Sequence, residues 1–142
     1  MKLFLIAIGL VYSLMAADAS EAAKKLGVYN NYEKANTEAK KSDKILVLVI
    51  VKNPCPYCDR FVNNTLSDSG IQKELKKYVV GIVDINDVYP KGFKPAMTPV
   101  TVFVHPRSGD IVWESMGAVS IEGFKSDLKE ATISREEDDV EQ

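Results

Sequence analysis

A seven-residue apolar run, Ile45 to Val51, leads into a pair of cysteines, Cys55 and Cys58. The run is rich in β-branched side chains and has polar neighbours, which is typical of a strand buried on both faces. Pro56 follows the first cysteine and suits the first position of a helix, because the N–H that proline lacks would have no partner there. These residues therefore predict a buried strand, a short loop and a helix that begins at Cys55.

The position of Cys55 at a helix N-terminus bears on its reactivity. Unpaired N–H groups and the helix dipole favour negative charge at that end of a helix. Because the thiolate is the reactive form of cysteine, we expect this position to lower the pKa of the Cys55 thiol. Cys58 lies one turn later on the same face, within reach of a disulfide with Cys55. The pair predicts redox chemistry.

Composition limits the class of protein and its partners. The chain has 142 residues, of which 27% are charged, and a net charge of −2, which fits one globular domain and argues against disorder. No basic stripe is visible, so we expect no nucleic-acid partner. No second pair of cysteines exists to form a separate structural disulfide. We predict no cofactor, because the chain has no G-x-G-x-x-G motif for a nicotinamide or a flavin.

The first 19 residues have the three parts of a secretory signal peptide. Lys2 supplies a positive start, an apolar stretch follows, and Ala17-Asp18-Ala19 is an A-x-A cleavage pattern. Export would place the cysteine pair in an oxidising compartment such as a periplasm, where a lone pair is more often catalytic than structural. The alternative is an uncleaved N-terminal segment that anchors the protein in a membrane.

The rest of the chain alternates helical and strand patterns. We predict helices over 28–42, from 56, over about 70–78, and from Ser120. Asp68 or Ser69 is expected to cap the third of these helices. Strands are predicted over 44–51, 78–85, 99–104 and 111–116. The short link between the last two strands favours an antiparallel hairpin. We expect residues 20–134 to form one domain after removal of residues 1–19, and residues 135–142 to be a frayed acidic tail.

This order of elements, together with two motifs, resembles the thioredoxin fold over about residues 28–132. One motif is the strand that leads into Cys55-Pro56-Tyr57-Cys58. The other is Met97-Thr98-Pro99-Val100, which precedes the hairpin, Gly117 and the last helix. The chain is similar to exported thioredoxin-like proteins with a C-P-Y-C active site. The resemblance implies an α/β fold with helices on both sides of a central mixed sheet and a C-terminal antiparallel hairpin and helix.

The resemblance also implies the roles of the site residues. Cys55 would be the nucleophile and Cys58 the resolving cysteine of a thiol–disulfide oxidoreductase that acts on protein substrates. The bond between Thr98 and Pro99 would be cis and would lie beside the pair, so that the backbone of Thr98 can pair with a substrate strand.

Four further residues lie where they bear on the site. Pro56 and Tyr57 lie between the cysteines, and we expect both to contact the substrate. Lys52 could add positive potential near the thiolate, although a solvated lysine at a strand end is the commoner case. His105, the only histidine, is expected to be a turn residue and not a catalytic base.

The sequence departs from thioredoxin at three places. Pro54 replaces a tryptophan, Pro-Tyr replaces Gly-Pro between the cysteines, and Val49 replaces a buried aspartate. Without that carboxylate, water or the departing substrate thiolate would take the proton of Cys58. We prefer a reductase over an oxidase. A difference of about 30 mV in reduction potential corresponds to only about 1.4 kcal/mol. One hydrogen bond to the sulfur could therefore change the direction of the reaction.

The cysteine pair implies an electron donor, and it is also compatible with two other classes of function. A reductase would need electrons from a membrane donor protein, and we expect a monomer that serves cytochrome c maturation, sulfur oxidation or general reduction. A metal-binding or metal-delivery module would use Cys55, Cys58 and His105, which is one ligand short of a structural zinc site. A non-catalytic binding domain would use the pair as a structural disulfide.

Overall fold

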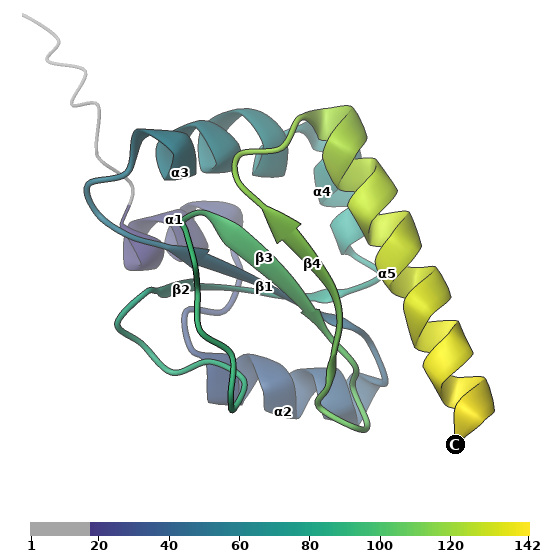
Figure 1. The fold of residues 1–142 in the computed structure, drawn as a ribbon. Helices are drawn as coiled ribbons and strands as arrows, with labels where there is room; N and C mark the ends of the chain where they lie inside the picture. The colour runs from purple at the N-terminus through teal and green to yellow at the C-terminus, as the bar shows by residue number, and fades with distance from the viewer. Residues whose placement is uncertain (1–17) are drawn as a thin grey trace, which may run out of the picture.

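The computed structural model describes residues 18–142. The predicted signal peptide therefore lies outside the described residues, except for Asp18 and Ala19. The described part forms a four-stranded mixed sheet with helices on both faces (Figure 1). In chain order, the elements are α1 (Ala19–Leu26), α2 (Tyr32–Ser42), β1 (Leu46–Val51), α3 (Pro56–Arg60), the π-helical segment η1 (Phe61–Leu66), α4 (Ser69–Leu75), β2 (Val79–Asp84), β3 (Val100–Val104), β4 (Ile111–Met116) and α5 (Ile121–Glu141).

The apolar run that precedes the cysteines forms β1, an inner strand of the sheet. The strand order is β2-β1-β3-β4, with β1 parallel to β2 and antiparallel to β3. Because β1 has a strand on each side and helices on both faces, all of its side chains are buried, as the sequence predicts. The predicted hairpin is confirmed by β3 and β4, which pair antiparallel with a shift of register between Phe103 and Val104.

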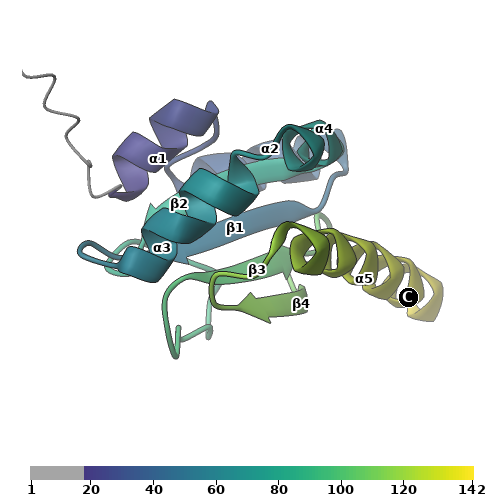
Figure 2. The ribbon, with the colours of Figure 1, turned by 90° about the horizontal axis from the view of Figure 1, so that it is seen from above.

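The side chains of β1 alternate between two apolar clusters, as the pleat of a strand requires. Residues 47, 49 and 51 pack with the cysteines and with side chains from α1, α3, η1, α4 and α5. Residues 46, 48 and 50 pack on the other face, against two alanines of α2. Figure 2 shows α5 beside β3 and β4, and α1 near the opposite edge of the sheet. The core therefore lies on both sides of β1 and holds the strand that leads to the cysteine pair.

Helix caps set several of the observed boundaries. The carboxylate of Asp68 accepts the N–H of Ile71 at 3.0 Å and begins α4. The hydroxyl of Ser120 accepts the N–H of Gly123 at 3.1 Å and begins α5. Both caps agree with the sequence prediction, and each satisfies an N–H group that has no partner within its helix.

The beginning of the described part differs from the prediction. Helix α1 was not predicted, because its cap Asp18 and its first residue Ala19 fall inside the predicted signal peptide. Asp18 is its N-cap and accepts the N–H of Glu21 at 2.8 Å, so the predicted boundary after Ala19 falls within the first turn of a helix. The helix predicted over 28–42 starts only at Tyr32, because Tyr29 pairs with Gly81 at the outer edge of β2.

The acidic end of the chain also differs from the prediction. Residues 135–142 were expected to fray, but α5 continues through Glu141. Asp139 lies against the buried ring of His105 at 3.1 Å, and Arg135 donates to the carboxylate of Asp43 at 2.9 Å. These contacts join the end of α5 to two turns that are far from it in sequence. They hold the acidic end against the fold as a helix.

Candidate active site at the cysteine pair

Cys55 and Cys58 form a disulfide at the start of α3, with their Cα atoms 5.2 Å apart. Cys55 is the N-cap residue, and its sulfur accepts the N–H of Cys58 at 3.1 Å. Pro56 occupies the first turn, as predicted from the sequence. The site therefore consists of a sulfur at the end of a helix where the unpaired N–H groups favour negative charge.

The two sulfurs differ in their access to solvent. Cys55 is 5% exposed, whereas Cys58 is fully buried. Cys58 lies in the same apolar cluster as Val49, the residue that stands where thioredoxins have an aspartate. An incoming partner can therefore reach Cys55 first, and Cys58 can react only with a group that is already attached to Cys55.

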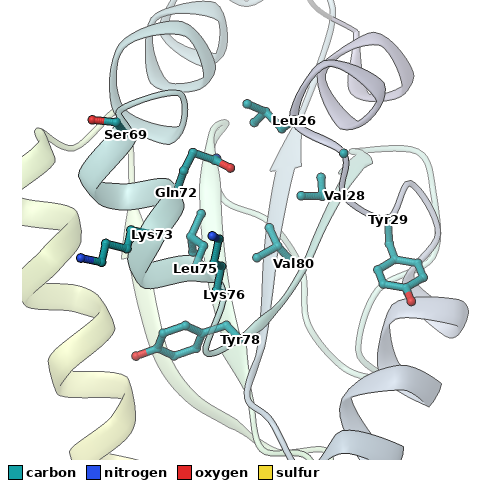
Figure 3. Close-up of a pocket in the computed structure, with 11 residues that line it drawn as sticks. Leu26, Val28, Tyr29, Ser69, Gln72, Lys73, Leu75, Lys76, Tyr78 and Val80 are labelled. Atoms are coloured by element: carbon teal, nitrogen blue, oxygen red, sulfur yellow. The ribbon is translucent and has the colours of Figure 1, made fainter.

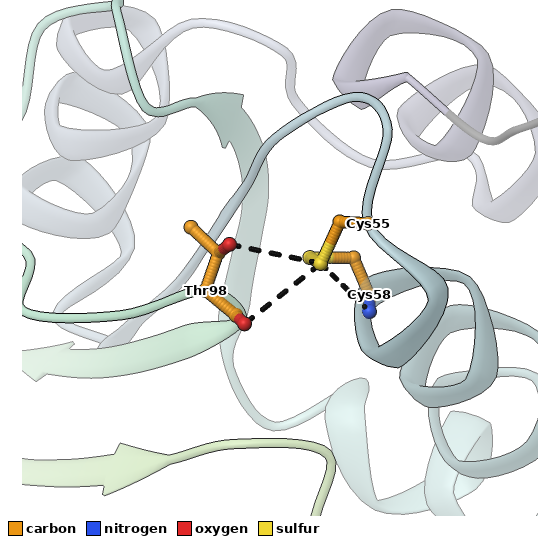
Figure 4. Close-up of a disulfide and its surroundings, with 3 residues drawn as sticks. All are labelled: Cys55, Cys58 and Thr98. Atoms are coloured by element: carbon orange, nitrogen blue, oxygen red, sulfur yellow. Dashed lines mark hydrogen bonds between the residues drawn. A yellow bond between two sulfur atoms is a disulfide. The ribbon is translucent and has the colours of Figure 1, made fainter.

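Thr98 lies against the sulfur of Cys55, although 43 residues separate them. The Sγ atom of Cys55 is 3.6 Å from the hydroxyl oxygen and 3.8 Å from the carbonyl oxygen of Thr98 (Figure 4). The Thr98–Pro99 peptide bond is cis, as is the Asn53–Pro54 bond. In the reduced protein, the hydroxyl of Thr98 could donate a hydrogen bond to a thiolate at Cys55, which would stabilise the charged form.

The residues expected to contact a substrate surround this sulfur. Pro56 is exposed, and Tyr57 is 60% exposed. The guanidinium of Arg60 lies over the Tyr57 ring, 5.3 Å from its centroid, and holds the ring at the surface. Met97, which the sequence analysis did not assign to the substrate surface, is 44% exposed just before Thr98.

Gly117 is a second residue whose contribution was not predicted. Its N–H donates to the carbonyl of Pro99 at 2.8 Å, and its φ of +85° is one that L side chains rarely adopt. Gly117 therefore ties the loop after β4 to the segment that lies against Cys55. In the sequence, the only indication of this role is that Gly117 directly follows a predicted strand and precedes the cap of the last helix.

Lys52 and His105 do not contribute a contact to the cysteine site. Lys52 is exposed at the end of β1. His105 is fully buried at the far end of β3 from Pro99, where its Nδ1 accepts the N–H groups of Arg107 and Ser108. His105 is thus held in the turn after β3, as predicted. Among residues 18–142, no group of three or more His, Cys, Asp and Glu side chains is arranged to hold a metal ion.

A cavity of about 570 Å³ lies at a different place, between α4 and the segment that follows α1 (Figure 3). Leu26, Val28, Leu75 and Val80 contribute apolar side chains to it, and Lys73 is among its polar lining. None of the residues assigned to the cysteine site lines this cavity. This cavity is therefore separate from the cysteine pair.

Comparison with known protein families gives one match. Residues 32–132 match the family described as a thioredoxin-like domain. This range includes α2, the cysteine pair, the Thr98–Pro99 bond and the first half of α5. No curated protein sequence matches the chain.

Solved structures show the same fold. A thioredoxin from Thermus thermophilus superposes with a TM-score of 0.66 at 23% identity, over 76% of this chain and 88% of that one. The periplasmic thioredoxin SoxS from Paracoccus pantotrophus, in its reduced form, gives a TM-score of 0.51 at 16% identity, over 64% and 98%. A protein described as DsbH oxidoreductase gives 0.50 at 19% identity, over 71% and 83%. These similarities confirm the predicted fold class.

Proposed function

Because this chain belongs to the thioredoxin-like domain family, we propose that it is an exported thiol–disulfide oxidoreductase that reduces disulfides in protein substrates. A thioredoxin-like fold with two cysteines at disulfide distance supports exchange chemistry. The observation that carries the proposal is the sulfur of Cys55, which caps α3, lies against Thr98 and is the more exposed of the pair.

The first step is an attack by Cys55. In the dithiol form, the Cys55 thiolate attacks one sulfur of a substrate disulfide. A bond forms between Cys55 and that sulfur, the substrate S–S bond breaks, and the second substrate sulfur leaves as a thiolate. The N–H of Cys58, which lies 3.1 Å from the Cys55 sulfur in the disulfide form, and the hydroxyl of Thr98 are the groups placed to stabilise the attacking thiolate.

The second step releases the substrate. Cys58 loses its proton and attacks the sulfur of Cys55, which forms the intramolecular disulfide and expels the other substrate sulfur as a thiolate. The proton of Cys58 goes to a departing substrate thiolate or to water, because the apolar surroundings of Cys58 contain Val49 in place of a carboxylate. Two electrons thus pass from the cysteine pair to the substrate, which ends as a dithiol.

The reductase direction requires a source of electrons. We assign this role to a membrane protein that returns the pair to the dithiol, since the chain has no nicotinamide or flavin motif. Run in reverse, the same two steps would oxidise a substrate dithiol. The direction depends on how strongly the surroundings of Cys55 stabilise its thiolate, because a more stable dithiol form makes the pair a stronger oxidant.

Export is the second part of the proposal. The N-terminal sequence has the parts of a signal peptide, and the similar SoxS protein is described as periplasmic. Within residues 18–142, none of the helices has the length and apolar character needed to cross a bilayer. We propose a periplasmic monomer, with anchoring through an uncleaved N-terminal segment as the alternative. We place the start of the folded domain at Asp18, because this residue caps α1.

Trapping of substrates tests the exchange reaction. In Cys58→Ser the second step cannot occur, so the protein should accumulate mixed disulfides with its substrates through Cys55. The adducts should disappear on addition of dithiothreitol, and Cys55→Ser, the matched control, should form none. Native protein should also accelerate the reduction of insulin by dithiothreitol. A Cys58→Ser protein that traps nothing, together with a native protein that leaves insulin intact, would contradict the proposed enzyme and favour a structural disulfide.

A further inference from the structure

Thr65 differs from the other threonines that lie on helices. Thr37 in α2 and Thr132 in α5 donate their hydroxyls to the carbonyl four residues earlier in the same helix, at 2.8 Å and 2.9 Å. This bond within a helix is the usual one for threonine. The hydroxyl of Thr65 instead donates to the carbonyl of Val119, 54 residues later, at 2.7 Å, and Thr65 is only 4% exposed.

Thr65 belongs to the helix that carries the cysteines. The π-helical segment η1 continues α3 directly, so the backbone is helical from Pro56 to Leu66. Phe61 packs edge-on against Phe124 of α5, with ring centroids 5.4 Å apart. This aromatic pair holds the helix against α5 at Phe61, and the hydrogen bond of Thr65 adds a second, directional restraint one turn later. The bond can therefore set the rotation and the position of the helix along its axis.

The loop that accepts this hydrogen bond also holds the segment beside Cys55. Two residues before Val119, the N–H of Gly117 donates to the carbonyl of Pro99 at 2.8 Å. The residue before Pro99 is Thr98, whose hydroxyl lies 3.6 Å from the sulfur of Cys55. The helix, the loop over 117–119 and the segment over 98–99 thus form a closed ring of contacts that begins and ends at Cys55.

We propose that Thr65 is a positioning residue, which holds the N-terminus of the cysteine helix against Thr98 and thereby stabilises the dithiol form of the pair more than the disulfide form. The inference rests on the proposed exchange function and adds a residue to it. In the disulfide form, a covalent bond restrains the sulfur of Cys55. After reduction, only the helix N–H groups and the hydroxyl of Thr98 restrain it, so the fixed position of the helix matters more in that form.

The equilibrium of the pair with glutathione tests this inference. Thr65→Val keeps the shape of the side chain and removes its hydroxyl. We expect the equilibrium constant to shift about fivefold toward the protein disulfide, the factor that corresponds to the loss of one hydrogen bond, here the bond from the Thr98 hydroxyl to the Cys55 thiolate. We expect the midpoint of the pH dependence of alkylation at Cys55 in the reduced protein to move to higher pH. A hydroxyl that only stabilises the fold would stabilise both redox forms equally and would leave the constant unchanged.

Two matched controls accompany this variant. Thr65→Ser keeps the hydroxyl and should restore the native constant. Thr37→Val removes the hydroxyl of a threonine whose bond stays within its own helix, and it should not change the constant. A constant that remains native in Thr65→Val, even in a less stable protein, would overturn the inference, and so would a shift toward the dithiol.

A double-mutant cycle tests the route through Thr98. If Thr65 acts by holding the helix against Thr98, then Thr65→Val should shift the constant less in a Thr98→Val background than in the native one. Equal shifts in both backgrounds would overturn the proposed route. Failure of the native pair to exchange with glutathione would contradict the proposed function itself, whereas native exchange with no effect of Thr65→Val would overturn only this inference.

Discussion

The Nε2 atom of His105 lies 3.1 Å from a carboxylate oxygen of Asp139, and this contact joins the turn after β3 to the last turns of α5. The other ring nitrogen, Nδ1, accepts the N–H groups of Arg107 and Ser108 at 3.1 Å and 3.2 Å. Because Nδ1 accepts, Nε2 carries the proton and donates it to Asp139. His105 therefore uses both of its nitrogens to hold the fold together.

Removal of this histidine should affect stability and leave the chemistry of the cysteines intact. His105→Ala leaves two backbone N–H groups without their partner, removes the hydrogen bond to Asp139 and opens a cavity in a fully buried site. We expect the free energy of unfolding, measured in urea, to fall by about 3 kcal/mol. The alkylation rate of Cys55 should not change in the folded variant. A large loss of that rate would support the metal or catalytic-base role that the sequence left open.

Asp43 should make stability depend on pH. Hydrogen bonds from Arg107, and then from Arg135, hold the pKa of the Asp43 carboxyl below its ordinary value of 3.8. A carboxyl whose pKa is lowered by folding contributes stability above its unfolded pKa, and this contribution is lost as the pH falls through the folded pKa. Native protein should therefore be more stable than Asp43→Asn above about pH 4, and the difference should vanish at lower pH.

Asparagine is a well-matched replacement for Asp43, because it removes the charge and keeps the backbone conformation. Asp43 has a φ of +53°, and asparagine accepts this left-handed conformation as readily as aspartate does. Urea unfolding of both proteins from pH 2 to pH 7, at low and at high salt, provides the measurement. A difference that persists unchanged at pH 2 would mean that the charge on Asp43 is not its source. High salt should reduce the difference, because the carboxylate is exposed.

Tyr57 should influence the binding of protein substrates. Its ring is 60% exposed beside the cysteines, so Tyr57→Ala should change the free energy of unfolding by less than about 0.5 kcal/mol. We expect the KM for a protein disulfide to rise roughly tenfold, as for an aromatic residue that anchors an interface. The rate with a small-molecule disulfide should be unchanged. Tyr29→Ala, at a surface tyrosine that is 39% exposed at the edge of β2, is the control, and an equal effect there would contradict a role specific to Tyr57.

Asp18 should stabilise the beginning of the domain. Its side chain caps α1, so Asp18→Ala should lower the free energy of unfolding in urea by about 1 kcal/mol. Asp18→Asn keeps an oxygen that can accept the N–H of Glu21 and should be close to native. If export is accompanied by cleavage, we expect the mature protein to retain Asp18. A mass that corresponds to a first residue of Ser20 would contradict this expectation.

Much of the fold was predictable because its causes are local. The buried strand β1, the cap of α5 at Ser120 and the hairpin of β3 and β4 each depend on residues within a few positions of one another. The cap at Cys55 is local for the same reason. Helix α1 was missed although it is local, because its cap and its first residue lie inside the predicted signal peptide.

The sequence by itself determined which strand is buried, where the cysteine helix begins and which sulfur caps it, because periodicity and capping act over a few residues. The resemblance implied that Thr98 lies beside the pair, but only the tertiary structure decided that its hydroxyl meets the sulfur of Cys55, that Thr65 reaches Val119 and that Asp139 meets His105. These contacts join residues 34 to 54 positions apart. A hydrogen bond between two distant residues leaves no repeating pattern in the sequence, so only the packing of the helices on the sheet brings its two ends together.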